Sequence, residues 1–72
     1  MKLPQISGEA CVKAIKRAGF YFDRQKGSHV VLLRDNPKAR VIVPAHRVLK
    51  KGTLHQILLD ANLKLEDFLK LL

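Results

Sequence analysis

The stretch FYFDRQKGSHVVLLRDNPKARVIV, residues 20–43, decides the fold because it contains three apolar segments separated by two short turns. In residues 20–25 the side chains alternate, with Phe20 and Phe22 expected on one side, as in a half-buried strand. The Lys-Gly pair that follows predicts a compact turn, because Gly27 can adopt a positive φ without a steric penalty. The first half of the stretch therefore predicts a strand that leads into a hairpin.

Two further strands are expected in the second half of this stretch. Residues 28–34 form an aliphatic run, and Asn36-Pro37 then predicts a turn because the fixed φ of proline suits its second position. Residues 40–43 predict the third strand, which ends at Pro44 because proline cannot donate a hydrogen bond to a sheet. The middle of the chain thus predicts a three-stranded antiparallel meander.

A helix is expected before the sheet, near residues 8–18. Ser7 is a suitable N-cap residue, Glu9 places a negative charge in the first turn, and Gly19 supplies a C-terminal stop. The apolar residues at helical spacing within this range are Cys11, Val12, Ile15 and Ala18. This pattern indicates an amphipathic helix.

The C-terminal third of the chain predicts two more helices. Residues 53–56, Thr-Leu-His-Gln, have the form of a capping box, and Asn62 is suited to end the helix that follows. Residues 65–72 indicate one further short helix. The order α-β-β-β-α, with an extra short C-terminal helix, predicts a two-layer α+β fold with the helices on one face of the three-stranded sheet. We expect a single domain, residues 1–72.

The second strand is apolar on both sides, since Val30 and Leu32 point one way while Val31 and Leu33 point the other way. Helices can cover only one of these sides. The other side is either an exposed aliphatic surface, as many small sheets have, or a surface that another chain covers. Both alternatives stay open on the sequence alone.

The chain carries a formal charge of +8 in 72 residues, and this charge is concentrated in the middle. Between residues 13 and 51 there are eleven Lys or Arg residues and two acidic residues, which gives +9 for this segment. A cationic zone attracts polyanions, of which nucleic acid is the commonest in the cytoplasm. The alternative is that the positive charge only keeps the protein soluble and binds no nucleic acid. A chain of this size can build only a shallow site, which suits surface chemistry on a large substrate.

Cys11 is the only cysteine, which excludes an internal disulfide, a thiolate zinc cage and a redox pair. The N-terminal residues lack the apolar block of a signal peptide, and no stretch approaches the roughly 18 apolar residues that a membrane-spanning helix needs. We therefore expect a soluble cytoplasmic protein that does not act at a membrane.

The candidate chemical groups are three histidines, His29, His46 and His55. Their separation and the few acids do not match a metal site, and Ser28 points away from its neighbour on a strand, so no serine nucleophile is expected. RNA carries its own nucleophile, the 2′-hydroxyl. A histidine that moves a proton and a cation near the phosphate are then sufficient for cleavage.

His29 is expected at the mouth of the hairpin, after Gly27, where a phosphate could approach the backbone closely. It is either part of such a site or a hydrogen-bonded structural residue at the start of a strand. His46 lies in the loop after the third strand, as a site residue or as a solvated loop histidine; His55 is given no role. The basic residues close to the first two histidines are Arg24, Lys26, Arg47, Lys50 and Lys51.

Two segments carry a resemblance that spans nearly the whole chain: SGEACVKAIKRAGFYFDRQKGSHVVL, residues 7–32, and VIVPAHRVLKKGTLHQILLDANLKLEDFL, residues 41–69. Their most telling marks are Ser7-Gly8, Gly19-Phe20, Gly27-Ser28-His29, Pro44-x-His46, Lys51-Gly52-Thr53-Leu54 and Asp67-Phe68. In this order and spacing, the chain resembles the HicA family of toxins from type II toxin–antitoxin modules.

The resemblance implies a fold like that of the double-stranded-RNA-binding domain and an mRNA interferase, which cleaves messenger RNA without a metal or other cofactor and slows translation. The histidine of the Gly-Ser-His stretch is catalytic in such toxins and corresponds to His29, and the loop histidine of the family corresponds to His46. Val30 stands where many relatives carry a polar or aromatic residue, so the second proton-transfer group is unassigned.

Under this interpretation the partners are RNA and a HicB-like antitoxin that silences the toxin. The antitoxin, or a second copy of the chain in a homodimer, is expected on the open face of the sheet. The residues expected to contact RNA are Lys26, Gly27, Ser28, His46, Arg47, Lys50 and Lys51.

Two other functions remain as rivals. A non-catalytic RNA-binding module would have the same fold and charge, so only a test of cleavage separates it from the enzyme. A small DNA-binding or protein-binding module is the weaker rival, because the two main helices are separated by three strands and no compact helix-turn-helix is visible.

Overall fold

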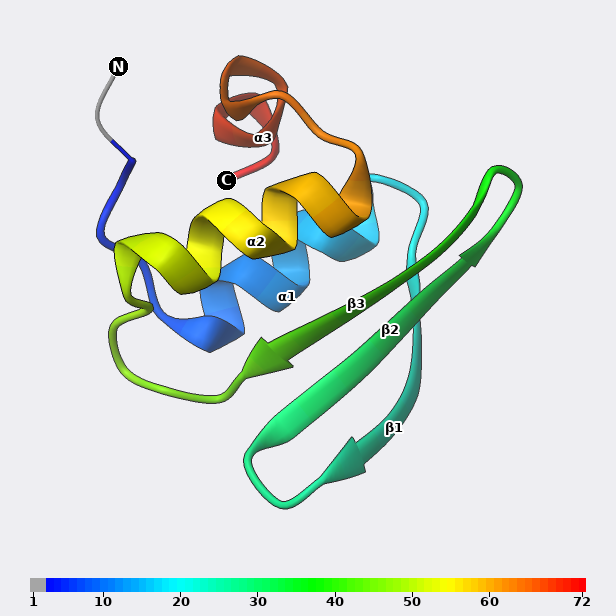
Figure 1. Ribbon diagram of the computed structural model, residues 1–72, viewed down its shortest axis with the longest axis horizontal. Helices are drawn as coiled ribbons and strands as arrows, with labels where there is room; N and C mark the ends of the chain where they lie inside the picture. Colours follow the sequence, from blue (N-terminus) through cyan, green and yellow to red (C-terminus); the bar gives the residue numbers. More distant parts are fainter. Residues whose placement is uncertain (1–2) are drawn as a thin grey trace.

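A computed structural model describes residues 3–72 as a three-stranded sheet and three helices (Figure 1). The elements are α1 (Gly8–Arg17), β1 (Tyr21–Lys26), β2 (His29–Asp35), β3 (Lys38–Pro44), α2 (Lys51–Ala61) and α3 (Leu65–Leu71). The expected order, with an extra C-terminal helix, is confirmed. The predicted α+β fold, which is like that of the double-stranded-RNA-binding domain, is also confirmed.

The sheet is an antiparallel meander in the order β1-β2-β3, as expected. The β1–β2 turn consists of residues 27 and 28, so Lys26 pairs with His29. The turn therefore lies one residue later than the Lys26-Gly27 turn that the sequence predicts. The register of β1 shifts between Phe22 and Arg24, where Asp23 is an extra residue on this outer strand. Such a bulge bends a strand and increases its twist.

The first helix begins and ends where its sequence signals lie. The Ser7 hydroxyl accepts a hydrogen bond from the amide of Ala10 at 3.0 Å, which satisfies one of the free donors of the first turn. Gly19 has a φ of 97°, a conformation open to glycine, and the chain leaves the helix there. Within residues 3–72, none of the helices is both long enough and apolar enough to cross a membrane.

The second helix begins earlier than its capping signal suggests. The amide of Leu54 donates to the carbonyl oxygen of Lys50 at 2.9 Å, so Thr53 already lies inside the helix and cannot cap it; the predicted capping box is wrong. The start is set instead by Leu49, which is buried and whose amide donates to the carbonyl of Ile6 at 2.8 Å. Asn62, with a φ of 57°, ends the helix as expected.

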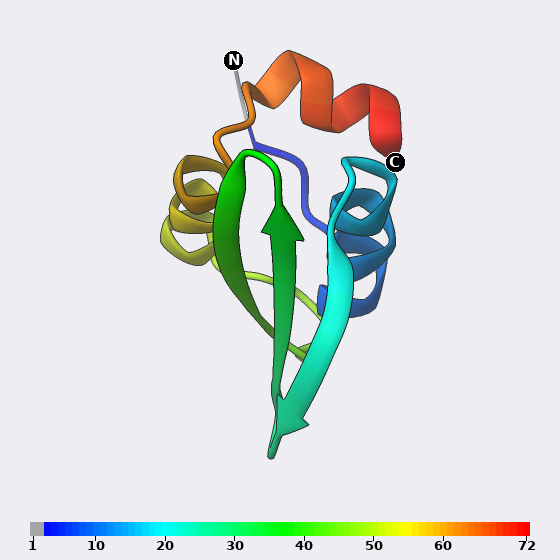
Figure 2. The same ribbon diagram turned by 90° about the vertical axis from the view of Figure 1, so that its right-hand side faces the viewer.

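The core lies between the sheet and the helices. Figure 2 shows α1 and α2 on the same side of the sheet, with α3 across their upper ends. The residues of this core with the largest fully buried side chains are Phe68, Ile15, Leu32, Leu54, Val41, Val43 and Cys11. The Arg17 guanidinium donates to the carbonyl of Leu71 at 2.6 Å, so α3 is attached to α1 by a polar contact as well as by Phe68.

The face of the sheet that points away from the helices is apolar, as the sequence suggests, but Val31 at its centre is less exposed than expected. Val31 is only 6% exposed there, although no helix covers it, since Arg24 and Ile42 flank it on the two neighbouring strands. The exposed apolar groups on this face are Tyr21, at 45%, and Ile42, at 41%. The chain itself therefore covers the centre of this face.

Candidate functional site

His29 is the first residue of β2 and its side chain is exposed. It pairs with Lys26 on one side and with Pro44 on the other. Because successive side chains on a strand alternate, His29 points to the same face as Val31, away from the helices. Within residues 3–72 its ring makes no hydrogen bond, so the ring is available to a bound molecule.

The turn before His29 has a defined geometry. Gly27 has a φ of 60°, which a residue with a side chain adopts only with strain, and no atom lies within 4 Å of where its Cβ would be. The Gln25 side-chain amide donates to the carbonyl of Gly27 at 3.2 Å, and the carbonyl of Ser28 accepts from the amide of Ala45 at 2.6 Å. The turn is thereby attached to the loop that follows β3.

The loop after β3 is held against the start of α1. The carbonyl oxygen of His46 accepts a hydrogen bond from the amide of Gly8 at 2.8 Å. Gly8 is buried, and a Cβ at this position would collide with the carbonyl oxygen of Pro44. Glycine is therefore required here by close contact of two backbones, which fixes the position of His46 and of Arg47 after it.

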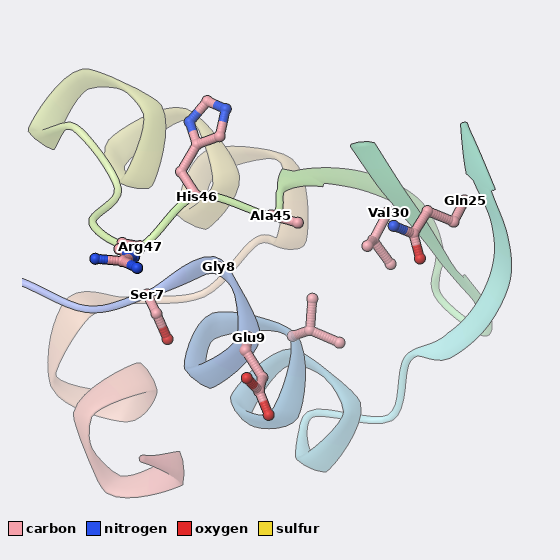
Figure 3. A pocket seen from close by; sticks show the side chains of 9 residues that line it. Ser7, Gly8, Glu9, Gln25, Val30, Ala45, His46 and Arg47 are labelled. Atoms are coloured by element: carbon pink, nitrogen blue, oxygen red, sulfur yellow. The ribbon is translucent and has the colours of Figure 1, made fainter. Parts of the chain in front are cut away.

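A hollow of about 390 Å³ opens beside this contact, and we call it the α1 hollow (Figure 3). Its lining residues are Ser7, Gly8, Glu9, Val12, Gln25, Val30, Ala45, His46 and Arg47. His46 and Arg47 therefore border a cavity. His29 does not line the cavity, because Val30 does and its neighbour points to the opposite face of the strand.

Positive charge predominates around the hairpin turn and the loop, where Glu9 is the acid that lines the same hollow as His46 and Arg47. Among residues 3–72, the ion pairs are Lys13 with Glu9 and Arg24 with Asp23. The exposed cations of the predicted site that take part in neither pair are Lys26, Arg47, Lys50 and Lys51. Lys50 and Lys51 stand at the start of α2, which places them after the loop that carries Arg47.

Other reactive groups have structural surroundings. Burial raises the pKa of the Cys11 thiol to about 12, so it is a packing residue and not a nucleophile. A hydrogen bond from the Tyr21 hydroxyl to Asp35, at 2.8 Å, raises the pKa of Tyr21. Within residues 3–72, no three histidine, cysteine or acidic side chains gather as a metal site requires.

The structure places the predicted residues in two groups, and the Ser28–Ala45 hydrogen bond joins the hairpin turn to the loop that leads to the second group. Lys26, Gly27, Ser28 and His29 form the hairpin turn, and the residues from His46 to Lys51 form the loop and the helix start. Sequence reasoning missed the α1 hollow and the contributions of Gln25 and Val12 to it. The hollow depends on the contact between Gly8 and Pro44, for which the only sequence signal is a glycine next to an N-cap serine.

A comparison with known families agrees with this geometry. The family model described as HicA toxin of bacterial toxin–antitoxin matches residues 8–63, a range that includes both the hairpin turn and the loop. A search of curated proteins found no match. The match covers more than half of the 72 residues, so the chain belongs to the HicA toxin family of bacterial toxin–antitoxin systems.

Proposed function

We propose that this toxin is an mRNA interferase, an endoribonuclease that needs no metal and slows translation by cutting messenger RNA. The observation that carries the proposal is His29, an exposed imidazole with no hydrogen bond to residues 3–72, beside Lys26 at the end of a hairpin. An imidazole held by hydrogen bonds within the protein would be less free to reach a phosphate. His29 has the exposure that a proton-transfer group needs.

The proposed reaction uses the RNA as its own nucleophile. The 2′-oxygen attacks the adjacent phosphorus, the bond from phosphorus to the 5′-oxygen breaks, and the products are a 2′,3′-cyclic phosphate and a 5′-hydroxyl. His29 accepts the 2′-proton or donates a proton to the leaving 5′-oxygen, and a partner not yet assigned performs the other transfer. The ammonium of Lys26 stabilises the negative charge that develops on the phosphoryl oxygens.

The sugar–phosphate backbone would lie along the cations of the turn and the loop. Lys26 and Arg47 belong to different segments, which the Ser28–Ala45 hydrogen bond keeps together. Lys50 and Lys51 extend the positive charge to the start of α2. The exposed backbone of Gly27 and Ser28 lets a phosphate approach closely, because Gly27 has open space where a side chain would be. In this proposal His46 binds RNA.

The antitoxin of the module is the natural inhibitor in this proposal. A HicB-like protein that covers the sheet face of His29 would also cover the exposed side chains of Tyr21 and Ile42. A second copy of the toxin is the alternative occupant of that face. Since Val31 is already buried in the isolated chain, the exposure of Ile42 and Tyr21 in a purified complex is the measurement that tests this placement.

The deciding experiment compares His29→Ala with His55→Ala, an exposed histidine of α2 that lies outside the proposed site. Proteins treated with a chelator are incubated with a labelled transcript, and both cleavage and affinity are measured. We expect His29→Ala to lose about 100-fold or more of the cleavage rate while its affinity falls less than about threefold, because phosphate contacts dominate binding. His55→Ala should match the parent protein.

Two results would contradict this function. Equal cleavage by the parent and by His29→Ala would remove His29 from the mechanism. A parent protein that binds the transcript but never cuts it would instead be a non-catalytic RNA-binding module, which is the rival interpretation of the same fold.

A further inference from the structure

The α1 hollow combines an apolar wall with a few polar groups, as small-molecule sites do. The apolar wall consists of Val12, Val30 and Ala45. Val12 and Val30 are partly buried and pack against the hydrophobic core, so this wall is in place before any ligand binds. The hollow is therefore preformed, which lowers the entropy that a ligand loses on binding.

The polar groups of the hollow can pair with both donors and acceptors. The side-chain N–H of Gln25 donates to the Gly27 carbonyl, which leaves the side-chain oxygen of Gln25 free as an acceptor. The Ser7 hydroxyl accepts from the amide of Ala10 and still has a proton to donate. Figure 3 shows Gln25 and Ser7 on different sides of the hollow. A planar ligand with mixed donor and acceptor edges fits this arrangement.

A phosphate group does not suit the interior of the hollow. The amide of Gly8 donates to the carbonyl of His46, and the amides of Ala10 and Cys11 donate to the hydroxyl and the carbonyl of Ser7. The first turn of α1 therefore has few N–H groups left for an anion. Glu9 adds a carboxylate to the lining, paired at its edge with Lys13 at 3.6 Å. This carboxylate repels a phosphate but can accept hydrogen bonds from the amino or imino groups of a base.

The rim of the hollow is cationic where RNA would enter. Arg47 and His46 lie there, on the side opposite Gln25 (Figure 3). Both a guanidinium and an imidazole can stack on an unpaired base, and the guanidinium can also bind the phosphate next to it. The ligand that matches both rim and interior is a nucleotide whose base is inside and whose phosphate is outside.

We propose that the α1 hollow binds one unstacked base of the RNA substrate and so determines the sequence at which the toxin cuts. The inference rests on the RNA cleavage proposed above. Val30 in the hollow directly follows His29 on the other face of β2, so an RNA strand that passes over the hairpin turn reaches both. In this proposal the base binds on the face of β2 that carries Val30, and the phosphate reacts on the opposite face, beside His29.

The test uses a pool of RNA with a randomised window and two variants of the hollow. Gln25→Leu removes the amide acceptor, and Ala45→Phe fills the hollow from an exposed position. Val48→Phe is the matched control, because Val48 is 57% exposed in the same loop but does not line the hollow. Sequencing of the cut ends gives the base preference at each position, and thermal melting checks that each variant is folded.

We expect the parent and Val48→Phe to prefer the same base at one position near the cut. Gln25→Leu should weaken this preference about fivefold, which is the effect of one hydrogen bond of about 1 kcal/mol. Ala45→Phe should abolish the preference. If both variants of the hollow cut with the parent's base preference, or if the parent has no preference, the proposal is wrong.

A separate outcome concerns the proposed enzyme activity. If the parent cuts no RNA, the proposed function fails, and the hollow is judged by selection of bound RNA from the same pool. Enrichment of one base by the parent and by Val48→Phe, but not by the two hollow variants, would still support a base-binding hollow. The same enrichment by all four proteins, or none by the parent, would reject it.

Discussion

Gly8 and Pro44 lie so close that the start of α1 has no room for a side chain against the end of β3. The same backbone contact includes the hydrogen bond from Gly8 to the carbonyl of His46. One glycine thus determines both how α1 packs and where the loop with His46 lies. This dual role makes Gly8 a position where stability and activity should change together.

Gly8→Ala should lower the free energy of unfolding by about 1–3 kcal/mol, the range for an overpacked core position. For a chain of this size, each kcal/mol corresponds to a fall of about 4–8 °C in Tm. Cleavage should decrease even at temperatures where the variant is folded, because the His46 loop is displaced. Thermal melting and a cleavage assay at low temperature measure the two effects.

Gly52→Ala is the matched control for this substitution. Gly52 lies in the first turn of α2, and no atom lies within 4 Å of where its Cβ would be. Alanine should therefore leave Tm unchanged or raise it, since alanine favours helix. Equal losses of stability at the two glycines would contradict the close contact at Gly8.

His46→Ala should reduce RNA cleavage without reducing Tm. Within residues 3–72 the ring of His46 makes no hydrogen bond, and the Gly8 contact uses only its backbone oxygen, which alanine retains. Calorimetry and a cleavage assay on the same preparation test this expectation. A parallel loss of Tm and activity would mark His46 as structural.

Arg34 and Arg47 should respond differently to truncation. The Arg34 guanidinium lies 4.6 Å from the ring centre of Phe20 and donates to the carbonyls of Pro37 and Ala61, so its role is structural. Arg34→Ala should lower the free energy of unfolding by about 1–2 kcal/mol. Its effect on the salt dependence of RNA binding should be small.

Arg47→Ala should instead leave Tm nearly unchanged, because Arg47 is exposed and takes part in no ion pair within residues 3–72. If Arg47 contacts a phosphate, the slope of log K against log salt should become shallower by about one unit. Titrations at several salt concentrations measure this slope. If Arg34→Ala changed the salt slope and Arg47→Ala lowered Tm, the proposed RNA path would be wrong.

Cys11 should not react with thiol reagents in the folded protein. Burial raises its pKa to about 12, so almost no thiolate exists at pH 8, whereas in the unfolded chain its pKa is near the ordinary 9.0. For the same reason the folded state binds the proton more tightly, and stability should fall as the pH rises from about 9 towards 12. Labelling with iodoacetamide, with and without denaturant, tests the first part. Rapid labelling without denaturant would contradict the burial.

Local signals predicted the order of the elements, and tertiary contacts decided what those signals missed. The turn near Gly27 and the stop at Gly19 are properties of neighbouring residues, so the sequence shows them directly. The half-buried alternation expected for residues 20–25 is wrong, because all residues of β1 are exposed and no element covers Phe22. The start of α2 depends instead on Leu49, whose burial and hydrogen bond to Ile6 join segments far apart in the chain. A local capping motif at Thr53 could not compete with that contact.

The candidate site was predicted only in part, for a similar reason. His29 and Lys26 come together because the turn consists of residues 27 and 28; the sequence around Gly27 predicts a compact turn there but places it one residue earlier. The α1 hollow has no such local signal, since Gln25 reaches it from β1 and Ala45 from the loop after β3, and these segments are far apart in the sequence. Burial of Val31 by its strand neighbours was likewise invisible in a one-dimensional pattern.

The extra residue at Asp23 lies on the exposed edge strand of the sheet. The bulge leaves β1 with an irregular row of backbone groups and an Arg24–Asp23 ion pair along its border. A strand from a neighbouring molecule pairs less well with an edge of this kind. The bulge at Asp23 therefore disfavours edge-to-edge aggregation of this toxin through β1.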